Sequence, residues 1–418
     1  MKVLVLGGGY CQLNMIKRLK DDRHYIILVD YLENNPGKTF ADEHHIISTF
    51  DIPAVTNLVQ ITSAEAIITM GTDQPVLTAA IAAGITGLPF YVGGETALSV
   101  TNKLVMKSKF DEHGIPSVNH RFISMDFKPE DIEGISFPAV IKPVDSQGQR
   151  GIFKVMGPDD IRLHLNETFS YTRENKILLE EYYPNDEITI SGWVNERKAT
   201  IISVVDRVTM ETENRIGICI AHNYPSRHYD AYKGEIHRLT QEIVDAFGIT
   251  EGPLYFQFLI GDRGILVNEI AMRIGGAYED IAIPVFSGID ILGMVSDHIF
   301  GYDQDLAQLN NYIMPENKCM SVQMFFVKPG TISHITPIYE LLSYDGVEDA
   351  LFIVAEDDII GNIENATARA GYFIISGVDY SDVMKKTDGV FNKLQILDNY
   401  GNNLIIKYSD YRNKYKFI

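Results

Sequence analysis

Cysteines, basic residues and long apolar runs are all scarce in this chain. The three cysteines, Cys11, Cys219 and Cys319, are far apart and odd in number, which excludes a disulfide framework and a cysteine-based metal motif. We therefore expect a reducing, cytoplasmic environment. The net charge of −20 argues against a nucleic-acid or anionic-membrane partner. No apolar run is long enough to span a membrane, and the N-terminus lacks the charged and apolar regions of a signal peptide.

The composition that is present is that of an ordinary globular protein. A chain of 418 residues predicts two to four domains or subdomains. Hydrophobic residues make up 45% and charged residues 22%, both typical of a folded, soluble chain. The sequence contains no internal repeats and no low-complexity tracts.

The first hundred residues alternate between strand and helix patterns. Strands are predicted at Lys2–Leu6, Tyr25–Val29 and Glu65–Met70, and helices at Cys11–Lys20 and Gln74–Ala83. Such alternation predicts a parallel sheet covered by helices.

A glycine run, 7–9, lies at the first strand–helix turn, and Asp30 ends the second strand. Dinucleotide binding is disfavoured because the third glycine of that fingerprint would fall at Gln12. We favour a tight turn that approaches a small substrate.

A hairpin is predicted in the middle of the chain. The segments 254–260 and 265–270 are apolar and β-prone, and the Gly-Asp-Arg-Gly run between them is typical of a turn. A three-residue loop at 262–264 would pair Ile260 with Leu266.

Counting back along this hairpin places Gln257 opposite Glu269, so both side chains share one face. Arg273 follows four residues later. An amide oxygen and a carboxylate suit magnesium, which completes its shell with phosphate oxygens and water, and an arginine can hold an anion. The alternative is a surface hairpin with both side chains solvated.

Two lysines and a glycine loop precede the hairpin. A helix is predicted around Ser99–Ile115, capped by Thr101 or Asn102 and ended by Gly114. It carries Lys103. A short strand then carries Lys142, and the glycine-bearing loop 146–151 leads to another strand at 152–156. Such a loop can cover phosphates with its backbone N–H groups, although a plain turn is the alternative.

Two strands meet at an acidic hinge further along the chain. The first, from Ile177, ends at Glu180 and Glu181, and Glu187 opens the next strand after a turn at Pro184. This hinge can offer backbone groups to an adenine edge, with Glu187 near the ribose. An acidic turn between strands is the alternative.

The order of these features resembles the ATP-grasp superfamily, closest to L-amino acid ligases and other carboxylate–amine ligases, and similar to carbamoyl phosphate synthetase and biotin carboxylase. The resemblance implies an α/β and α+β architecture: an N-terminal parallel αβ domain (1–100), a two-part ATP-grasp domain (101–176 and 177–310) and a C-terminal mixed αβ cap (311–418). It also implies ATP and Mg²⁺ or Mn²⁺ as cofactors, and a homodimer is the family's expectation.

The resemblance also implies roles for the individual residues. Catalytic roles would belong to Arg273 and Lys142, and metal binding to Gln257 and Glu269. The nucleotide would be bound by Lys103, Lys142, Ser146, Gly148, Gly151, Glu180, Glu181, Tyr183 and Glu187.

This chain departs from the family pattern in one run. The usual asparagine falls at Ala271 and the usual proline at Met272, so one oxygen ligand is missing and occupancy by two metals is in doubt. The following Ile274-Gly-Gly-Ala277 resembles the amino acid ligase branch.

The resemblance implies ATP-dependent amide formation from small-molecule carboxylate and amine substrates, through an acylphosphate. When both substrates are amino acids, the product is a dipeptide. A bicarbonate-activating enzyme and a catalytically decayed nucleotide-binding protein are the alternatives. Arg215, His222 and Arg227 lie in a polar stretch between strands that faces either substrate or solvent. In the C-terminal part, strands are predicted at Val322–Val327 and within Ala370–Gly377, and a helix at Ser381–Leu397.

Overall fold

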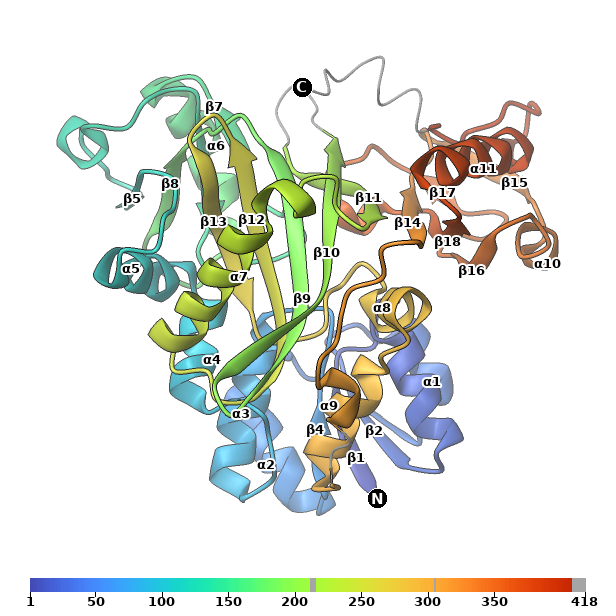
Figure 1. Ribbon diagram of the computed structural model, residues 1–418, viewed down its shortest axis with the longest axis horizontal. Coiled ribbons are helices and arrows are strands. Elements are labelled where there is room, and N and C mark those ends of the chain that lie inside the picture. Colours follow the sequence, from blue (N-terminus) through green and yellow to red (C-terminus); the bar gives the residue numbers. More distant parts are fainter. Residues whose placement is uncertain (211–215, 304–305, 408–418) are drawn as a thin grey trace.

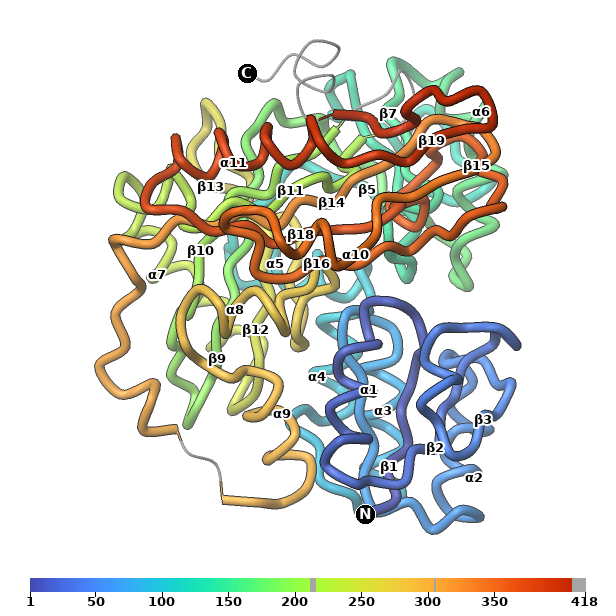
Figure 2. Tube along the Cα trace, turned by 90° about the vertical axis from the view of Figure 1, so that its right-hand side faces the viewer, coloured from blue at the N-terminus to red at the C-terminus, as the bar shows by residue number. Residues whose placement is uncertain are grey.

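The computed structural model describes residues 1–210, 216–303 and 306–407. The fold is mixed α/β, as predicted, and the C-terminal elements lie on one side of the N-terminal part and contact it, with the Tyr10 hydroxyl donating to the Ile353 carbonyl at 3.1 Å (Figures 1 and 2). Among the described residues, no single helix is long and apolar enough to cross a membrane, although two helices joined by a bend, Glu279–Ser287 and Ile291–Phe300, pass that test together by length and composition.

The N-terminal part is a parallel sheet in the order β3-β2-β1-β4, which confirms the prediction. The branched residues of β1, β2 and β4 are fully or nearly fully buried because helices cover the sheet, whereas the edge strand β3 is only partly buried. The elements are β1 (Lys2–Leu6), α1 (Leu13–Asp21), β2 (Tyr25–Val29), β3 (Glu43–His45), α2 (Ile52–Thr62), β4 (Ala66–Ile68) and α3 (Gln74–Thr86).

The glycine turn after β1 is closed by the protein itself. The Gly8 N–H donates to the Asp30 carboxylate at 2.7 Å, and a Cβ on Gly8 would lie 2.2 Å from the Asn35 side-chain oxygen. Asp30 therefore braces the turn and does not project into an open site.

The helix predicted around Ser99–Ile115 is two helices, α4 (Gly94–Thr101) and α5 (Lys103–His113). Asn102 has an extended backbone, and its side-chain oxygen accepts from Leu104 N–H at 2.9 Å, so it ends one helix and caps the next. This break makes Lys103 the first residue of α5.

A small four-stranded sheet follows, in the order β5-β8-β6-β7. The glycine loop 146–151 connects the antiparallel strands β6 and β7 at one end of it. The elements are β5 (His120–Ile123), β6 (Ala139–Pro143), β7 (Phe153–Val155), α6 (Pro158–Ser170) and β8 (Ile177–Glu181).

An eight-stranded sheet forms the centre of the molecule, in the order β13-β12-β9-β10-β11-β14-β18-β16. One hydrophobic cluster joins its inner face to the N-terminal sheet, so the two parts share a core. The elements up to residue 300 are β9 (Asp186–Asn195), β10 (Lys198–Met210), β11 (Ile218–Tyr224), α7 (Tyr229–Ala246), β12 (Gly252–Gly261), β13 (Gly264–Ala271), α8 (Glu279–Ser287) and α9 (Ile291–Phe300).

The C-terminal part adds three strands to the large sheet and a separate three-stranded sheet. The predicted helix Ser381–Leu397 is too long: α11 ends at Lys393 because Leu394 is extended, and Ile396 pairs with Ile335 in the small sheet. The elements are β14 (Cys319–Phe325), β15 (Gly330–Ile335), α10 (Ile338–Leu341), β16 (Val347–Phe352), β17 (Ile359–Ile360), β18 (Gly371–Gly377), α11 (Tyr380–Lys393) and β19 (Ile396–Asp398).

The hairpin of β12 and β13 is present, but its turn differs from the prediction. The loop has two residues, 262–263, so Ile260 pairs with Ile265 and the predicted pairing with Leu266 is wrong. A bulge near Phe258 then inserts one extra residue in β13 and shifts the register by one. Because of this shift, Gln257 still lies opposite Glu269, and that prediction is confirmed.

Candidate functional site

The start of α5 lies against β13, where Lys103 meets Glu269. The Lys103 Nζ atom donates to the Glu269 Oε1 atom at 2.8 Å and to the Ser146 carbonyl at 3.4 Å. Burial raises the pKa of Glu269, but Lys103, with Lys142 and Arg273 nearby, outweighs burial and holds that pKa below its usual value. The carboxylate is therefore ionised at neutral pH and available to a cation.

A second ionic cluster centres on Glu180, at the end of β8. Its two carboxylate oxygens lie 2.7 Å from Lys107 Nζ and 2.6 Å from Lys142 Nζ. The Lys107 and Glu180 side chains are only 1% and 2% exposed. Burial lowers the pKa of Lys107 although Glu180 opposes this effect. Sequence patterns did not identify Lys107, because a lysine on an amphipathic helix usually faces water.

A cavity of about 90 Å³ lies beside this cluster, between the hinge and the hairpin. The sequence-predicted residues Lys142, Glu180, Glu181, Tyr183 and Glu187 all line it. The other lining residues are Val118, Val140, Tyr182, Asn185, Thr209, Ile216, Gly217, Leu259 and Asn268. The fold therefore gathers residues of the hinge, the β6 lysine and the hairpin around one space, with apolar walls and charged ends.

The hinge is tied to the hairpin by Tyr183. Its hydroxyl donates to the Gly264 carbonyl at 3.0 Å and accepts from the Arg263 N–H at 2.8 Å. At the other end of the hinge, Glu187 pairs with Arg207 at 2.5 Å. Arg207 is a further buried cation that sequence patterns did not identify.

The glycine loop folds back onto two neighbouring parts of the molecule. The Gln147 side-chain oxygen accepts from the Asp73 N–H at 2.7 Å, at the start of α3. The Gly148 carbonyl accepts from the Ala366 N–H of the C-terminal part at 3.4 Å. Gly148 and Gly151 have φ angles of +71° and +69°, which other residues adopt with strain. The loop thus lies next to Lys103, where phosphates would be covered.

Gln257 and Glu269 suit a hard divalent cation. Both are partly buried, whereas the neighbouring Phe256 and Phe258 are fully buried on the other face of β12. No hydrogen bond occupies the Gln257 side chain among the described residues. The residues that the structure describes contain no cluster of three or more His, Cys, Asp or Glu side chains that could hold a metal ion without further ligands. The donor set fits a magnesium ion that takes further ligands from phosphates.

Arg273 is buried beneath this pair and contacts Asp73 of the N-terminal part. The guanidinium donates to the Asp73 carboxylate at 2.7 Å and lies over the Tyr255 ring at 4.7 Å. Sequence patterns did not identify Asp73. Its place just beyond β4 was the available signal, because ligands bind outside the carboxyl ends of parallel strands.

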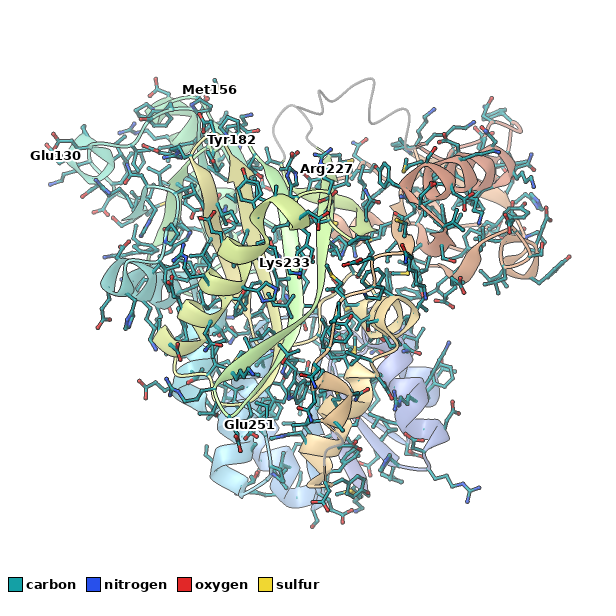
Figure 3. All side chains as sticks on the ribbon, viewed as in Figure 1. Glu130, Met156, Tyr182, Arg227, Lys233 and Glu251 are labelled. Carbon is teal, nitrogen blue, oxygen red and sulfur yellow. The ribbon has the colours of Figure 1, made fainter. Side chains whose placement is uncertain are left out.

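The polar stretch named from the sequence divides into two environments. His222 is fully buried in β11, and its Nδ1 atom lies 3.3 Å from a Glu279 oxygen. Burial lowers the pKa of His222, but Cys219 and Glu279 outweigh it and raise that pKa to about 9. Arg227, labelled in Figure 3, is 63% exposed and pairs with Asp186 at 2.8 Å. Arg215 lies outside the described residues.

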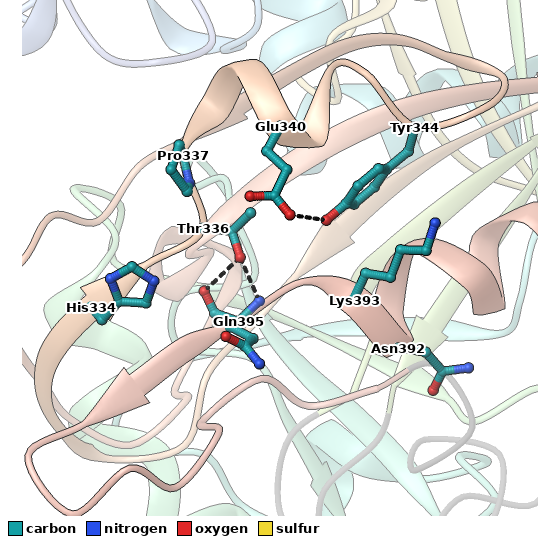
Figure 4. Close-up of a pocket in the computed structure, with 8 residues that line it drawn as sticks. All are labelled: His334, Thr336, Pro337, Glu340, Tyr344, Asn392, Lys393 and Gln395. Atoms are coloured by element: carbon teal, nitrogen blue, oxygen red, sulfur yellow. Dashed lines mark hydrogen bonds between the residues drawn. The ribbon is translucent and has the colours of Figure 1, made fainter.

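A larger pocket, of about 490 Å³, lies in the C-terminal part (Figure 4). Its lining residues are His334, Thr336, Pro337, Glu340, Tyr344, Asn392, Lys393 and Gln395. None of the sequence-predicted site residues lines it, and its buried hydroxyl, on Thr336, is already bonded to the Gln395 backbone at 2.8 Å. The region of Glu180 and Glu269, which gathers the sequence-predicted residues, is therefore the candidate site.

Two family models match the chain in the expected order. A model described as an ATP-grasp domain matches residues 135–280, and a model described as L-amino acid ligase C-terminal domain 2 matches residues 323–397. The resemblance stated from the sequence is confirmed.

Individual proteins agree with these matches. The L-arginine-specific L-amino acid ligase of Bacillus subtilis is 25% identical over 294 residues, which cover 66% of each chain. The carbamoyl phosphate synthase large chain of Clostridium botulinum is 23% identical over 345 residues, which cover 72% of this chain but 29% of that one. The chain therefore spans just under two thirds of the length of the first relative and less than one third of the length of the second.

Among solved structures, an L-amino acid ligase from Bacillus licheniformis has a TM-score of 0.79. It is 16% identical, and the alignment covers 96% of this chain and 99% of that one. At this identity the likeness establishes the fold.

Proposed function

We propose that this chain, which contains an ATP-grasp domain followed by an L-amino acid ligase C-terminal domain, is an ATP-dependent ligase that joins a carboxylate to an amine. The observation that carries the proposal is the contact between Lys103 and Glu269, beside the cavity lined by Lys142 and Glu180. It brings a cation that suits phosphate and a carboxylate that suits a metal ion from distant segments to one point.

The local charge supports a polyphosphate substrate. Four cations, Lys103, Lys107, Lys142 and Arg273, face three carboxylates in these clusters, although the whole chain has a net charge of −20. This positive excess within an acidic protein suits an anionic ligand.

Each residue around the cavity takes a part in nucleotide binding. The apolar walls hold the adenine, with the hinge backbone at Glu181 and Tyr183 and the Glu180 side chain at its edge. Glu187 binds the ribose hydroxyls. Lys103, Lys142 and the loop residues Ser146, Gly148 and Gly151 bind the phosphates.

Gln257 and Glu269 would hold the Mg²⁺ ion, which neutralises charge on the phosphates as they are transferred. Ala271 is the next residue of β13 on the same face as Glu269, and its methyl group provides no oxygen ligand. Glu269 keeps its negative charge for this role because Lys103 pairs with it.

The chemistry proceeds in two displacements. An oxygen of the substrate carboxylate attacks the γ-phosphorus of ATP, the bond to ADP breaks, and an acylphosphate forms. The uncharged amine then attacks the acyl carbon, the C–O bond to phosphate breaks, and the amine loses a proton as the amide forms. Arg273 orients the carboxylate and stabilises the oxyanion of the tetrahedral intermediate.

The C-terminal part closes the site from the other side. Arg369, just before β18, donates to the Gly276 carbonyl at 3.4 Å, and the Tyr372 ring stacks on Tyr278 with centroids 3.6 Å apart. These contacts reach the segment after Arg273, where the organic substrates would bind. A closed site excludes water, which would hydrolyse an acylphosphate.

The test is ADP release with ATP, Mg²⁺ and mixed amino acids, followed by mass-spectrometric identification of the product. We expect ADP release that requires both an acid and an amine, and a loss of at least about 100-fold in kcat for Glu269→Gln, because a charged metal ligand becomes neutral. ADP release that needs only bicarbonate would refute the ligase and favour a carboxyphosphate-forming enzyme. ATP binding without turnover would refute an active enzyme.

A further inference from the structure

The bulge in β13 gives Asn268 an unusual position. In a regular strand, consecutive side chains point to opposite faces, so Asn268 would point away from the site if Glu269 points into it. A bulge inserts one unpaired residue and redirects its side chain. Here the extra residue lies between Val267, which pairs with Phe258, and Glu269, which pairs with Gln257. That residue is Asn268.

The contacts of Asn268 place its side chain in the site. Its Oδ1 atom accepts from Lys142 Nζ at 3.3 Å, and the residue lines the same cavity as Glu180 and Glu187. Asn268 and Glu269 are both partly buried, whereas an alternating strand would bury one and expose the other. Asn268 therefore faces the cavity proposed for the nucleotide, and the adjacent Glu269 faces Lys103.

This position supplies an oxygen that the rest of the strand lacks. The next inward residue after Glu269 is Ala271, which is buried opposite Tyr255 and carries no donor atom. Lys142 lies 2.6 Å from Glu180 but 3.3 Å from Asn268, so its bond to the amide is the longer and weaker one. The Asn268 amide oxygen is therefore only weakly held by Lys142.

We propose that Asn268 donates its amide oxygen to the nucleotide-bound metal as a third protein ligand, beside Gln257 and Glu269. This inference rests on the proposed function. Two amide oxygens and one carboxylate leave three octahedral positions for phosphate oxygens and water, which is the arrangement that magnesium accepts. The bulge makes these three ligands possible, because it turns the side chains of the adjacent residues Asn268 and Glu269 toward one point.

The test compares the binding of ADP with and without Mn²⁺ by isothermal titration calorimetry, and the binding of Mn²⁺ to the protein–ADP complex by electron paramagnetic resonance. In Asn268→Ala we expect the affinity for Mn²⁺ in that complex to fall about tenfold, with ADP binding in EDTA nearly unchanged. In Asn268→Asp, which keeps an oxygen ligand and adds a charge, Mn²⁺ binding should equal or exceed that of the wild type.

Asn185→Ala is the matched control, because Asn185 carries the same amide group and lines the same cavity from the hinge. Its effect on ADP binding should be equal with and without Mn²⁺. Equal weakening of both forms in Asn268→Ala would overturn the inference, since Asn268 would then act on the phosphates or on Lys142 alone. Mn²⁺ binding that is unchanged in Asn268→Ala would overturn it as well.

The two proposals fail in different ways. Wild-type protein that binds neither ADP nor Mn²⁺–ADP would overturn the proposed function and this inference together. Wild-type binding with either of the contrary results for Asn268→Ala would overturn the inference alone. Thermal unfolding of each variant establishes that it is folded before these comparisons are made.

Discussion

The ion pair between Lys107 and Glu180 provides the sharpest test of how the site is held together. Replacing Lys107 with methionine keeps the volume and removes the charge. Glu180 would keep only Lys142, 2.6 Å away, as its partner. Removing one partner of a buried ion pair costs about 3 to 5 kcal/mol. Because one lysine remains, we expect a cost near 3 kcal/mol for Lys107→Met.

The reverse replacement should cost more. Glu180→Gln leaves both lysines without their carboxylate, and Lys107 is only 1% exposed, so we expect about 5 kcal/mol. The double variant Lys107→Met/Glu180→Gln removes the buried charges together. Its cost should lie well below the sum of about 8 kcal/mol, near 3 kcal/mol, because only Lys142, whose side chain is 15% exposed, is then left without its carboxylate.

The assay is equilibrium unfolding in urea, followed by the fluorescence of Trp193, which is the one tryptophan of the chain and is buried in β9. Lys109→Met on the same helix is the matched control. Its ammonium group lies over the Phe247 ring at 5.2 Å, so we expect a cost of about 1 kcal/mol or less. Additive costs in the double variant would refute the reasoning, as would a cost for Lys107→Met no larger than that of the control.

Two further predictions concern the loop and the buried histidine. Gly151→Ala should destabilise the protein by about 2 kcal/mol or more and weaken ATP binding, because its φ is +69° and the new Cβ would lie 2.7 Å from a Tyr171 ring carbon. Gly148→Ala, with φ +71° and nothing within 4 Å, should cost about 1 kcal/mol, and equal urea midpoints for the two variants would contradict the steric argument. The pKa of His222 is about 9, above the unfolded value of about 6.5, so its contribution of about 3 kcal/mol is fully present below pH 6.5 and is lost as pH rises to 9. His222→Asn should flatten urea unfolding free energies measured between pH 6 and 9, and a wild-type profile already flat over that range would contradict the pairing with Glu279.

The hairpin illustrates how far sequence reasoning reached. Apolar runs and the Gly-Asp-Arg-Gly turn predicted both strands, and the pairing of Gln257 with Glu269 is correct. The loop, however, has two residues and not three, and the bulge at Asn268 compensates for the difference. A bulge has no short-range signature here, because it depends on how β12 and β13 pack against β9 and the lysines.

Sequence patterns did not identify three charged residues of the site, for a related reason. Lys107, Asp73 and Arg207 each look like ordinary surface residues in their segments. The fold buries each one beside a partner distant in the sequence: Lys107 with Glu180, Asp73 with Arg273, and Arg207 with Glu187. Burial and partner choice follow from tertiary packing, which no local pattern encodes.

The sequence by itself determined the parallel N-terminal sheet, the hairpin that pairs Gln257 with Glu269, and the order of the lysines and the acidic hinge, because strand periodicity and turn chemistry act over a few residues. The tertiary structure alone decided which charges meet. Coulomb interactions and desolvation depend on distance and burial, and these arise only when α5, β8 and β13 come together in the folded chain.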